Sequence, residues 1–216
     1  MDSTVREEIF MAKLIFRYGA MNSGKSALLQ LVGHNYEEKD HKVILIKPGI
    51  DTKGGEKVVS RIGLERNVDE VIGKDELVIS KLEKHLEGLS CIIVDEAQFM
   101  TGEQIEELFC ITKLYDIPVI AYGLRTDFTT KGFEGAVRLL ELSDEIDEMA
   151  TICKCGKKAR FNARKINGDF VRVGNSVLID KSDELVEYEQ LCGKCYLEEV
   201  VGIDKDDIGK IKIIKK

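Results

Sequence analysis

The sequence contains no run of 18 or more apolar residues, the minimum that a helix needs to span a bilayer. Its apolar share of 44% and charged share of 33% are ordinary for a globular protein, and no membrane association is expected. The first eight residues carry acids and lack the apolar core of a signal peptide. We therefore expect them to form a loose leader, and we expect a cytoplasmic protein.

The chain also lacks an excess of positive charge and any internal repeat. Its 32 Lys and Arg against 39 Asp and Glu give a formal net charge of −7. This balance argues against duplex DNA or an anionic membrane as the main partner. A length of 216 residues suits one medium domain and a small accessory unit.

Four of the six cysteines form two close pairs, Cys153 with Cys155 and Cys192 with Cys195. Without a signal peptide, this pattern indicates a metal site in a reducing compartment, and reduced thiols without metal are the alternative. Four thiolates from two knuckles predict a closed, structural Zn²⁺ site. The first pair encloses only one residue, and we expect Gly156 to supply the freedom for a tighter bend. A piece as small as 151–201 also needs such a metal for stability.

Residues 19–26 fit the phosphate-binding loop pattern G-x-x-x-x-G-K-[ST] at every fixed position. An apolar, strand-like run at 14–18 precedes them, and apolar residues at helical spacing follow. The loop amides and the positive end of the helix are predicted to hold a triphosphate. The lysine is predicted to contact the outer phosphates, and the last serine is predicted to bind Mg²⁺. A glycine turn that binds nothing is the alternative. The predicted ATP and Mg²⁺ residues of this loop are Gly19, Ala20, Met21, Asn22, Ser23, Gly24, Lys25 and Ser26.

Further apolar runs predict buried strands, and helical patterns lie between them. A capping box of Thr101 and Gln104 marks the start of one helix, and helical spacing also occurs at 81–86. Such alternation predicts an α/β fold with a mostly parallel sheet, flanking helices and the phosphate loop of P-loop NTPases. We expect domains at 1–150 and 151–216, because cysteine pairs and short β-rich runs replace the long helices after Ala150. The predicted strands are 42–47, 91–94 and 117–123, with short candidates at 58–62 and 77–79.

Asp95 and Glu96 end the apolar run that starts at Cys91. On a strand beside the phosphate loop, Asp95 is predicted to bind Mg²⁺ and Glu96 to face the attacking group. That group is water in a hydrolase and an alcohol in a kinase, and the dipeptide does not choose between them. A solvated acidic turn is the alternative.

Four segments in this order resemble the cellular-type (type II) thymidine kinase family in its bacterial form. They are the phosphate loop, Lys47-Pro48-x-x-Asp51, Asp95-Glu96-Ala97-Gln98-Phe99 and Tyr122-Gly123-Leu124-Arg125-x-Asp127-Phe128. The resemblance covers about 13–196 and implies transfer of the γ-phosphate of ATP to the 5′-hydroxyl of thymidine, giving dTMP for DNA synthesis. It also implies a zinc-bearing lid domain, dimers or tetramers, and feedback by dTTP.

The resemblance implies a role for individual residues as well. Glu96 resembles the family's general base. Gln98 resembles a residue that lies on the ATP and Mg²⁺ side of the family's site. The residues that resemble thymidine contacts are Met21, Leu124, Phe128, Val173, Gly174 and Tyr188. Lys53, where the family often has arginine, and the shortened first cysteine pair depart from the family pattern.

Two other functions are open to the sequence. The run Asp95-Glu96-Ala97-Gln98 also resembles the acidic box of helicases, which suggests a nucleic-acid-stimulated ATPase. The second is a zinc-supported nucleotide-binding regulator without turnover.

Overall fold

The computed structural model describes residues 11–49, 57–174 and 185–210. The predictions for the leader, Asp51, Lys53 and most of the segment 176–187 lie outside these residues. The chain divides into two compact units. The sheet unit comprises Met1–Gly19, Ser23–Arg125 and Gly132–Met149; the cysteine unit comprises Ala20–Asn22, Thr126–Lys131 and Ala150–Lys216.

Six strands form the sheet of the sheet unit, and every pairing between them is parallel. The predicted parallel sheet with flanking helices is therefore confirmed. The strands stand in the order β5 (Glu70–Ile72), β2 (Lys42–Pro48), β6 (Leu89–Val94), β7 (Val119–Gly123), β1 (Leu14–Tyr18) and β8 (Glu145–Glu148). The sequence pattern identified β1, β2, β6 and β7, but not the edge strands β5 and β8.

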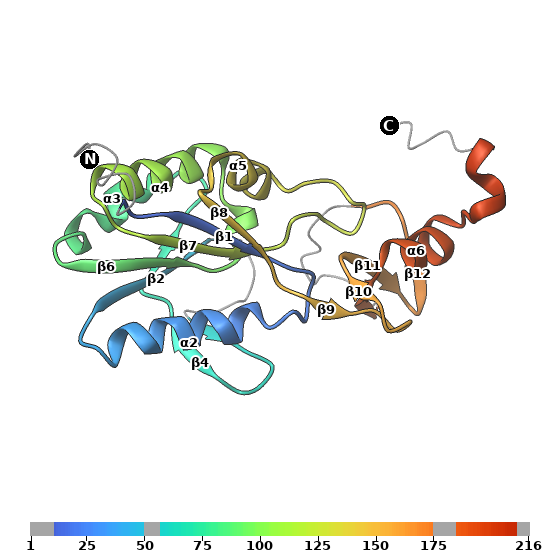
Figure 1. Cartoon of the computed structure of the whole chain (residues 1–216), viewed down its shortest axis with the longest axis horizontal. Coiled ribbons are helices and arrows are strands. Elements are labelled where there is room, and N and C mark those ends of the chain that lie inside the picture. The colour runs from blue at the N-terminus through green and yellow to red at the C-terminus, as the bar shows by residue number, and fades with distance from the viewer. Residues whose placement is uncertain (1–10, 50–56, 175–184, 211–216) are drawn as a thin grey trace, which may run out of the picture. The chain divides into compact units, whose positions relative to one another are not determined.

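Helices cover both faces of this sheet (Figure 1). Because successive side chains of a strand point to opposite faces, β6 contributes to two cores. Ile92 and Val94 pack in the core with residues of α3 (Val78–Leu82), α4 (Gly102–Leu114) and α5 (Glu134–Leu142). Cys91 and Ile93 pack on the other face with Leu29 of α2 (Lys25–Glu37).

Two short strand predictions need correction. The strand predicted at 58–62 is the shorter β3 (Lys57–Val59), which pairs with β4 (Glu65–Asn67). It ends where Ser60 begins a turn, in which Gly63 has φ 85°. The segment 77–79 is no strand, since α3 begins at Val78. Val78 and Leu82 lie one helical turn apart and are both buried, so these apolar residues form the buried face of a helix. A 3₁₀ turn at Glu83–His85 continues the predicted helical spacing.

The predicted capping box at the start of α4 is confirmed. The Gln104 backbone N–H donates to Thr101 Oγ1 at 3.2 Å, and the Thr101 N–H donates to Gln104 Oε1 at 3.1 Å. Gln104 Nε2 also donates to the carbonyls of Gly73 at 2.8 Å and Glu76 at 2.9 Å. The helix start is thus tied to the loop that precedes α3.

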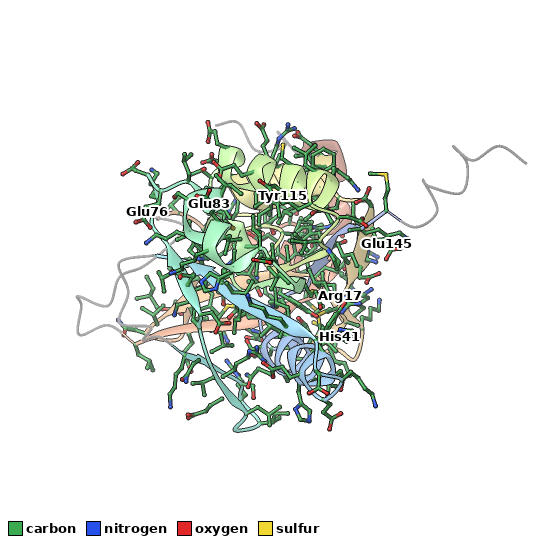
Figure 2. The ribbon with its side chains drawn as sticks, turned by 90° about the vertical axis from the view of Figure 1, so that its left-hand side faces the viewer. Arg17, His41, Glu76, Glu83, Tyr115 and Glu145 are labelled. Atoms are coloured by element: carbon green, nitrogen blue, oxygen red, sulfur yellow. The ribbon has the colours of Figure 1, made fainter. Side chains whose placement is uncertain are left out.

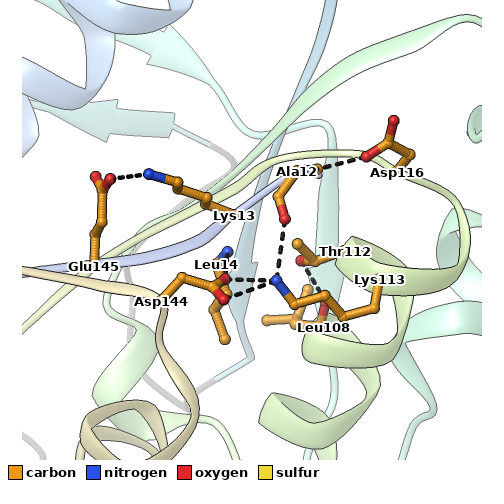
Figure 3. A network of polar contacts seen from close by, with 9 residues as sticks. All are labelled: Ala12, Lys13, Leu14, Leu108, Thr112, Lys113, Asp116, Asp144 and Glu145. Atoms are coloured by element: carbon orange, nitrogen blue, oxygen red, sulfur yellow. Dashed lines mark hydrogen bonds and ion pairs between the residues drawn. The ribbon is translucent and has the colours of Figure 1, made fainter. Parts of the chain in front are cut away.

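An ionic network fixes the amino end of β1 (Figure 3). Asp144 accepts from the Leu14 N–H at 2.7 Å and pairs with Lys113 of α4 at 2.7 Å. Lys113 Nζ also donates to the Ala12 carbonyl at 3.1 Å. These contacts hold the segment just before β8 against β1, which explains why an acidic strand joins the sheet edge.

Exposed acids lie around the sheet unit; Glu76, Glu83 and Glu145 are labelled in Figure 2 and point outward. Among the described residues, no helix combines the length and the apolar character that crossing a membrane requires.

The cysteine unit contains short antiparallel strands. β9 (Thr151–Ile152) pairs with β10 (Lys158–Ala159), and β11 (Phe161–Ile166) lies between β12 (Asp169–Val171) and β13 (Val186–Leu191). α6 (Gly193–Cys195), a π-helical segment (Tyr196–Val201) and a 3₁₀ segment (Lys205–Lys210) complete it.

Candidate active site

The phosphate loop begins where β1 ends. The Gly19 N–H donates to the Gly123 carbonyl at 3.3 Å, which joins the ends of β1 and β7. A Cβ at Gly19 would lie 2.4 Å from Ser23 Oγ and 2.6 Å from the Met149 carbonyl oxygen, so this close approach requires glycine. Gly24 has φ 81° and accepts from the Leu28 N–H at 3.0 Å, which starts α2.

Lys25 lies back on its own loop. Its Nζ donates to the Gly19 carbonyl at 3.0 Å and lies 3.4 Å from Ser23 Oγ. Burial lowers the pKa of Lys25, and the negative charges of Glu96 and Asp95 oppose that shift. The lysine and both acids therefore interact electrostatically at one edge of the sheet.

The acidic pair follows β6, which is not adjacent to β1. In the sheet, β7 lies between the two strands. Since all three strands are parallel, their carboxyl ends still meet at the same sheet edge. Burial, followed by repulsion from Glu96, raises the pKa of Asp95 to about 7. A cation at this position favours the charged carboxylate.

Glu96 has an uncommon backbone conformation for a residue with a side chain, with φ 51° and ψ 35°. It opens a short 3₁₀ turn, Ala97–Phe99, and its carbonyl accepts from the Phe99 N–H at 3.0 Å. Left-handed residues of this kind often occur at functional sites. The turn places Gln98 in direct contact with the Glu96 side chain, with Gln98 Nε2 2.5 Å from Glu96 Oε2.

The four paired cysteines gather in one cluster in the cysteine unit. The Sγ atoms of Cys153, Cys155, Cys192 and Cys195 all lie within 4.8 Å of one another. Zinc–sulfur bonds of about 2.3 Å in a tetrahedron separate the sulfurs by about 3.8 Å, so the cluster fits this ion. The Gly156 N–H donates to the Cys153 carbonyl at 2.8 Å with φ 82° at Gly156, which is the freedom expected for the tight first knuckle.

In the second knuckle, Cys192 favours the thiolate form, whereas hydrogen bonding with Cys155 raises the pKa of Cys195. The Cys195 backbone N–H donates to Cys192 Sγ at 3.5 Å. This hydrogen bond is the main reason that the pKa of Cys192 falls to about 7. A thiolate is the form that binds a metal ion.

The cysteine unit also holds several predicted thymidine contacts. Phe128 is 2% exposed, and the guanidinium of Arg164 covers one face of its ring. Arg164 Nε donates to the Tyr188 hydroxyl at 2.9 Å, and the Tyr196 hydroxyl donates to the Phe128 carbonyl at 2.7 Å. A Cβ at Gly174 would lie 3.5 Å from Arg164 Nη1 and 3.7 Å from Phe128 Cζ. The structure thus brings Phe128, Gly174 and Tyr188 together.

Val173, Leu124 and Met21 are the other predicted thymidine contacts. Val173 is 83% exposed, and Leu124 belongs to the sheet unit, where its N–H donates to Gln98 Oε1 at 2.9 Å. Met21 donates its backbone N–H to Asn162 Oδ1 at 2.8 Å within the cysteine unit.

Sequence analysis missed Asn162 and Arg164, which are 5% and 1% exposed. They alternate along β11 with Phe161 and Ala163, which pack in the core around the cysteines. A strand with one apolar and one polar face has this two-residue period. The alternation of polar residues at 162 and 164 with apolar ones was the sequence signal that could have identified a polar face on this strand.

A glycine- and lysine-bearing loop at the carboxyl edge of a parallel sheet, with two carboxylates following another strand at that edge, is the arrangement of phosphate-loop nucleotide-binding enzymes. The sequence model of the thymidine kinase family matches residues 12–196 of the chain. The chain belongs to this family, so the resemblance seen in the sequence motifs is confirmed.

Curated thymidine kinases are similar to this chain over nearly their full length. The thymidine kinase of Enterobacteria phage T4 is 44% identical over 193 residues, covering 87% of this chain and 97% of the relative. The thymidine kinase of Chromobacterium violaceum is 42% identical over 189 residues, covering 86% and 98%. That of Francisella tularensis subsp. holarctica is 39% identical over 197 residues, covering 88% and 99%. These matches do not favour the ATPase or the regulator.

Proposed function

We propose that the chain transfers the γ-phosphate of ATP to the 5′-hydroxyl of thymidine and releases dTMP. The observation that carries this proposal is that the phosphate loop and the acidic pair follow the carboxyl ends of β1 and β6, which lie parallel in one sheet. In a member of the thymidine kinase family, this arrangement supplies a triphosphate cradle and a base for an alcohol.

ATP is held by the loop amides of 19–24 and by Lys25, with Ser26 and Asp95 on the metal side. Ser26 and Asp95 would hold Mg²⁺, which would supply neutralisation of the negative charge that develops on the phosphates during transfer. Lys25 leaves the Gly19 carbonyl to contact the outer phosphates, because a phosphate oxygen is a better acceptor for its ammonium group than a neutral carbonyl.

Glu96 acts as the general base. Its carboxylate orients the 5′-hydroxyl and accepts the proton as the bond to phosphorus forms, a role worth about 10²- to 10⁴-fold in rate. Asp95 is assigned to the metal side, because a bound cation would favour the charged form of this buried carboxylate.

Thymidine is held by Met21, Leu124 and Phe128, with Val173, Gly174 and Tyr188 in the loop that closes over it. Aromatic rings and a thioether suit a flat pyrimidine with a methyl group. Because Phe128 is 2% exposed in this structure, a base stacks on it only after a neighbouring group has moved. A closing loop that also opens for product release meets this requirement.

The four cysteines hold a structural Zn²⁺. When bound, zinc with four thiolate ligands has no open position and serves the fold, not the chemistry. The cluster packs with Phe161 and Ala163 of β11 and with Tyr196, which holds the Phe128 carbonyl. Zinc therefore supports the residues on the thymidine side.

A nucleoside panel tests this function. The full chain is incubated with γ-labelled ATP, Mg²⁺ and thymidine, deoxyuridine, deoxycytidine or no nucleoside, and labelled products are separated. We expect label on thymidine. ADP formation stimulated by single-stranded DNA alone would instead show an ATPase, and nucleotide binding without turnover would show a regulator.

Three properties expected from the sequence stay predictions. These are assembly into dimers or tetramers, feedback by dTTP and location in the cytoplasm. Sedimentation of the purified chain and inhibition of thymidine phosphorylation by dTTP test the first two.

A further inference from the structure

We propose that Gln98 is a positioning residue, which holds the Glu96 carboxylate in place by linking it to the backbone of Leu124. This inference rests on the proposed function, since Glu96 needs a fixed position only if it acts as the base. All three residues belong to the sheet unit.

The orientation of the Gln98 amide follows from its partners. The Leu124 N–H can only donate, so the amide oxygen must face it, at 2.9 Å. The amide nitrogen is then left to donate to Glu96 Oε2, at 2.5 Å. Gln98 is 1% exposed, so water competes little for either bond.

Two glycines allow the Gln98 turn to pack this closely. A Cβ at Gly123 of β7 would lie 2.5 Å from Gln98 Oε1. A Cβ at Gly135 of α5 would lie 2.5 Å from the Ala97 carbonyl oxygen and 2.7 Å from that of Met100. The turn is therefore in close contact with the sheet on one side and with a helix on the other, and neither contact leaves room for a side chain.

The backbone of Glu96 adds a reason for such support. Its left-handed conformation costs free energy and persists only where the surroundings hold it. The side chain of Glu96 is only partly buried, so without the Gln98 bond its rotamers are less restricted. A fixed carboxylate is more effective than a mobile one, because catalysis depends strongly on geometry.

The phosphate-side role that the family resemblance implies for Gln98 predicts something different. An amide that binds ATP should affect the KM for ATP, whereas one that positions Glu96 should affect kcat. The variant Gln98→Met has a side chain of similar length without polar atoms. We expect its kcat to fall about 10- to 100-fold, while the KM for ATP changes less than about twofold.

A double-mutant cycle separates positioning from general damage. In the Glu96→Gln background the base is already lost, so we expect Gln98→Met to lower kcat by less than about twofold more. Gln104→Met is the matched control, because Gln104 is also a buried amide, 4% exposed, with backbone partners away from Glu96. It should lower the melting temperature and keep kcat.

Gly123→Ala is an independent variant, since its Cβ displaces the Gln98 oxygen, and it should reproduce the fall in kcat. The proposal is overturned if Gln98→Met keeps the wild-type kcat, raises only the KM for ATP, or costs as much in the Glu96→Gln background as alone. If the wild-type chain itself transfers no label to thymidine, the proposed function fails instead.

Discussion

The guanidinium carbon of Arg164 lies 3.7 Å from the centroid of the Phe128 ring. The same side chain donates from Nε to the Tyr188 hydroxyl at 2.9 Å and is 1% exposed. A desolvated cation–π contact is worth about 2 kcal/mol or more. One buried cation therefore holds two side chains that we assign to thymidine binding.

Replacing Arg164 tests this support. We expect Arg164→Met to raise the KM for thymidine about 10-fold or more, since Phe128 and Tyr188 lose a shared partner worth about 2 kcal/mol. The KM for ATP should stay constant. Arg172→Met, an exposed arginine of the same unit, is the control. A lower KM for thymidine would show instead that Arg164 competes with the base for Phe128.

Replacing Glu96 tests the base. Glu96→Gln keeps the size of the side chain and an acceptor but cannot take a proton, so kcat should fall about 10²- to 10⁴-fold. ATP affinity, measured by calorimetry with Mg²⁺, should change little. Turnover near the wild-type value would remove Glu96 from this role.

The raised pKa of Asp95 predicts how stability depends on pH. Because the folded state binds this proton more tightly, the stabilising contribution is complete below the ordinary value of 3.8 and is lost as pH rises through about 7. The variant Asp95→Asn carries no ionisable group at this position, so it does not lose this stability as the pH rises. Without nucleotide and Mg²⁺, the variant should melt on the order of 5 °C higher than wild type at pH 8, with a smaller difference at pH 5.

The exposed Asp75→Asn variant is the control for this comparison. It should follow the wild-type pH dependence of the melting temperature. Parallel curves for Asp95→Asn and wild type would contradict the predicted burial of a charge at Asp95.

Metal analysis tests the cysteine cluster. We expect one zinc per chain, lost in Cys192→Ser and retained in Cys110→Ser, whose exposed cysteine lies on α4. Removal of zinc should lower thermal stability, because metal binding contributes to folding free energy. It should also weaken thymidine binding more than ATP binding, since Tyr196 beside the cluster holds Phe128. An active, equally stable chain without metal would exclude a structural zinc.

The parts of the fold that sequence predicted are those with strong local patterns. β1, β2, β6 and β7 each contain a run of mainly apolar residues with buried side chains, and the Thr101 and Gln104 capping box is local to one helix start. β8 consists of Glu, Ile, Asp and Glu, and contacts of Asp144 with Leu14 and Lys113 hold the segment before it against β1. No local pattern reports such contacts between distant segments.

The residues of the candidate site also divide into those with a local sequence pattern and those defined by contacts between distant segments. Spacing alone identified the phosphate loop, the acidic pair and the four cysteines, because a phosphate cradle and a metal knuckle each need fixed local geometry. Arg164 and Asn162 went unnoticed, since their partners Phe128 and Met21 are remote in the chain.

By itself the sequence determined the chemistry that the chain carries, namely a lysine on a glycine loop, two carboxylates after a strand and two thiol pairs. Only the tertiary structure decided that β7 lies between the strands bearing the loop and the acids, and that the Leu124 N–H orients the Gln98 amide toward Glu96. The physical reason is that strand order and these hydrogen bonds depend on packing across the whole sheet, which residue spacing does not encode.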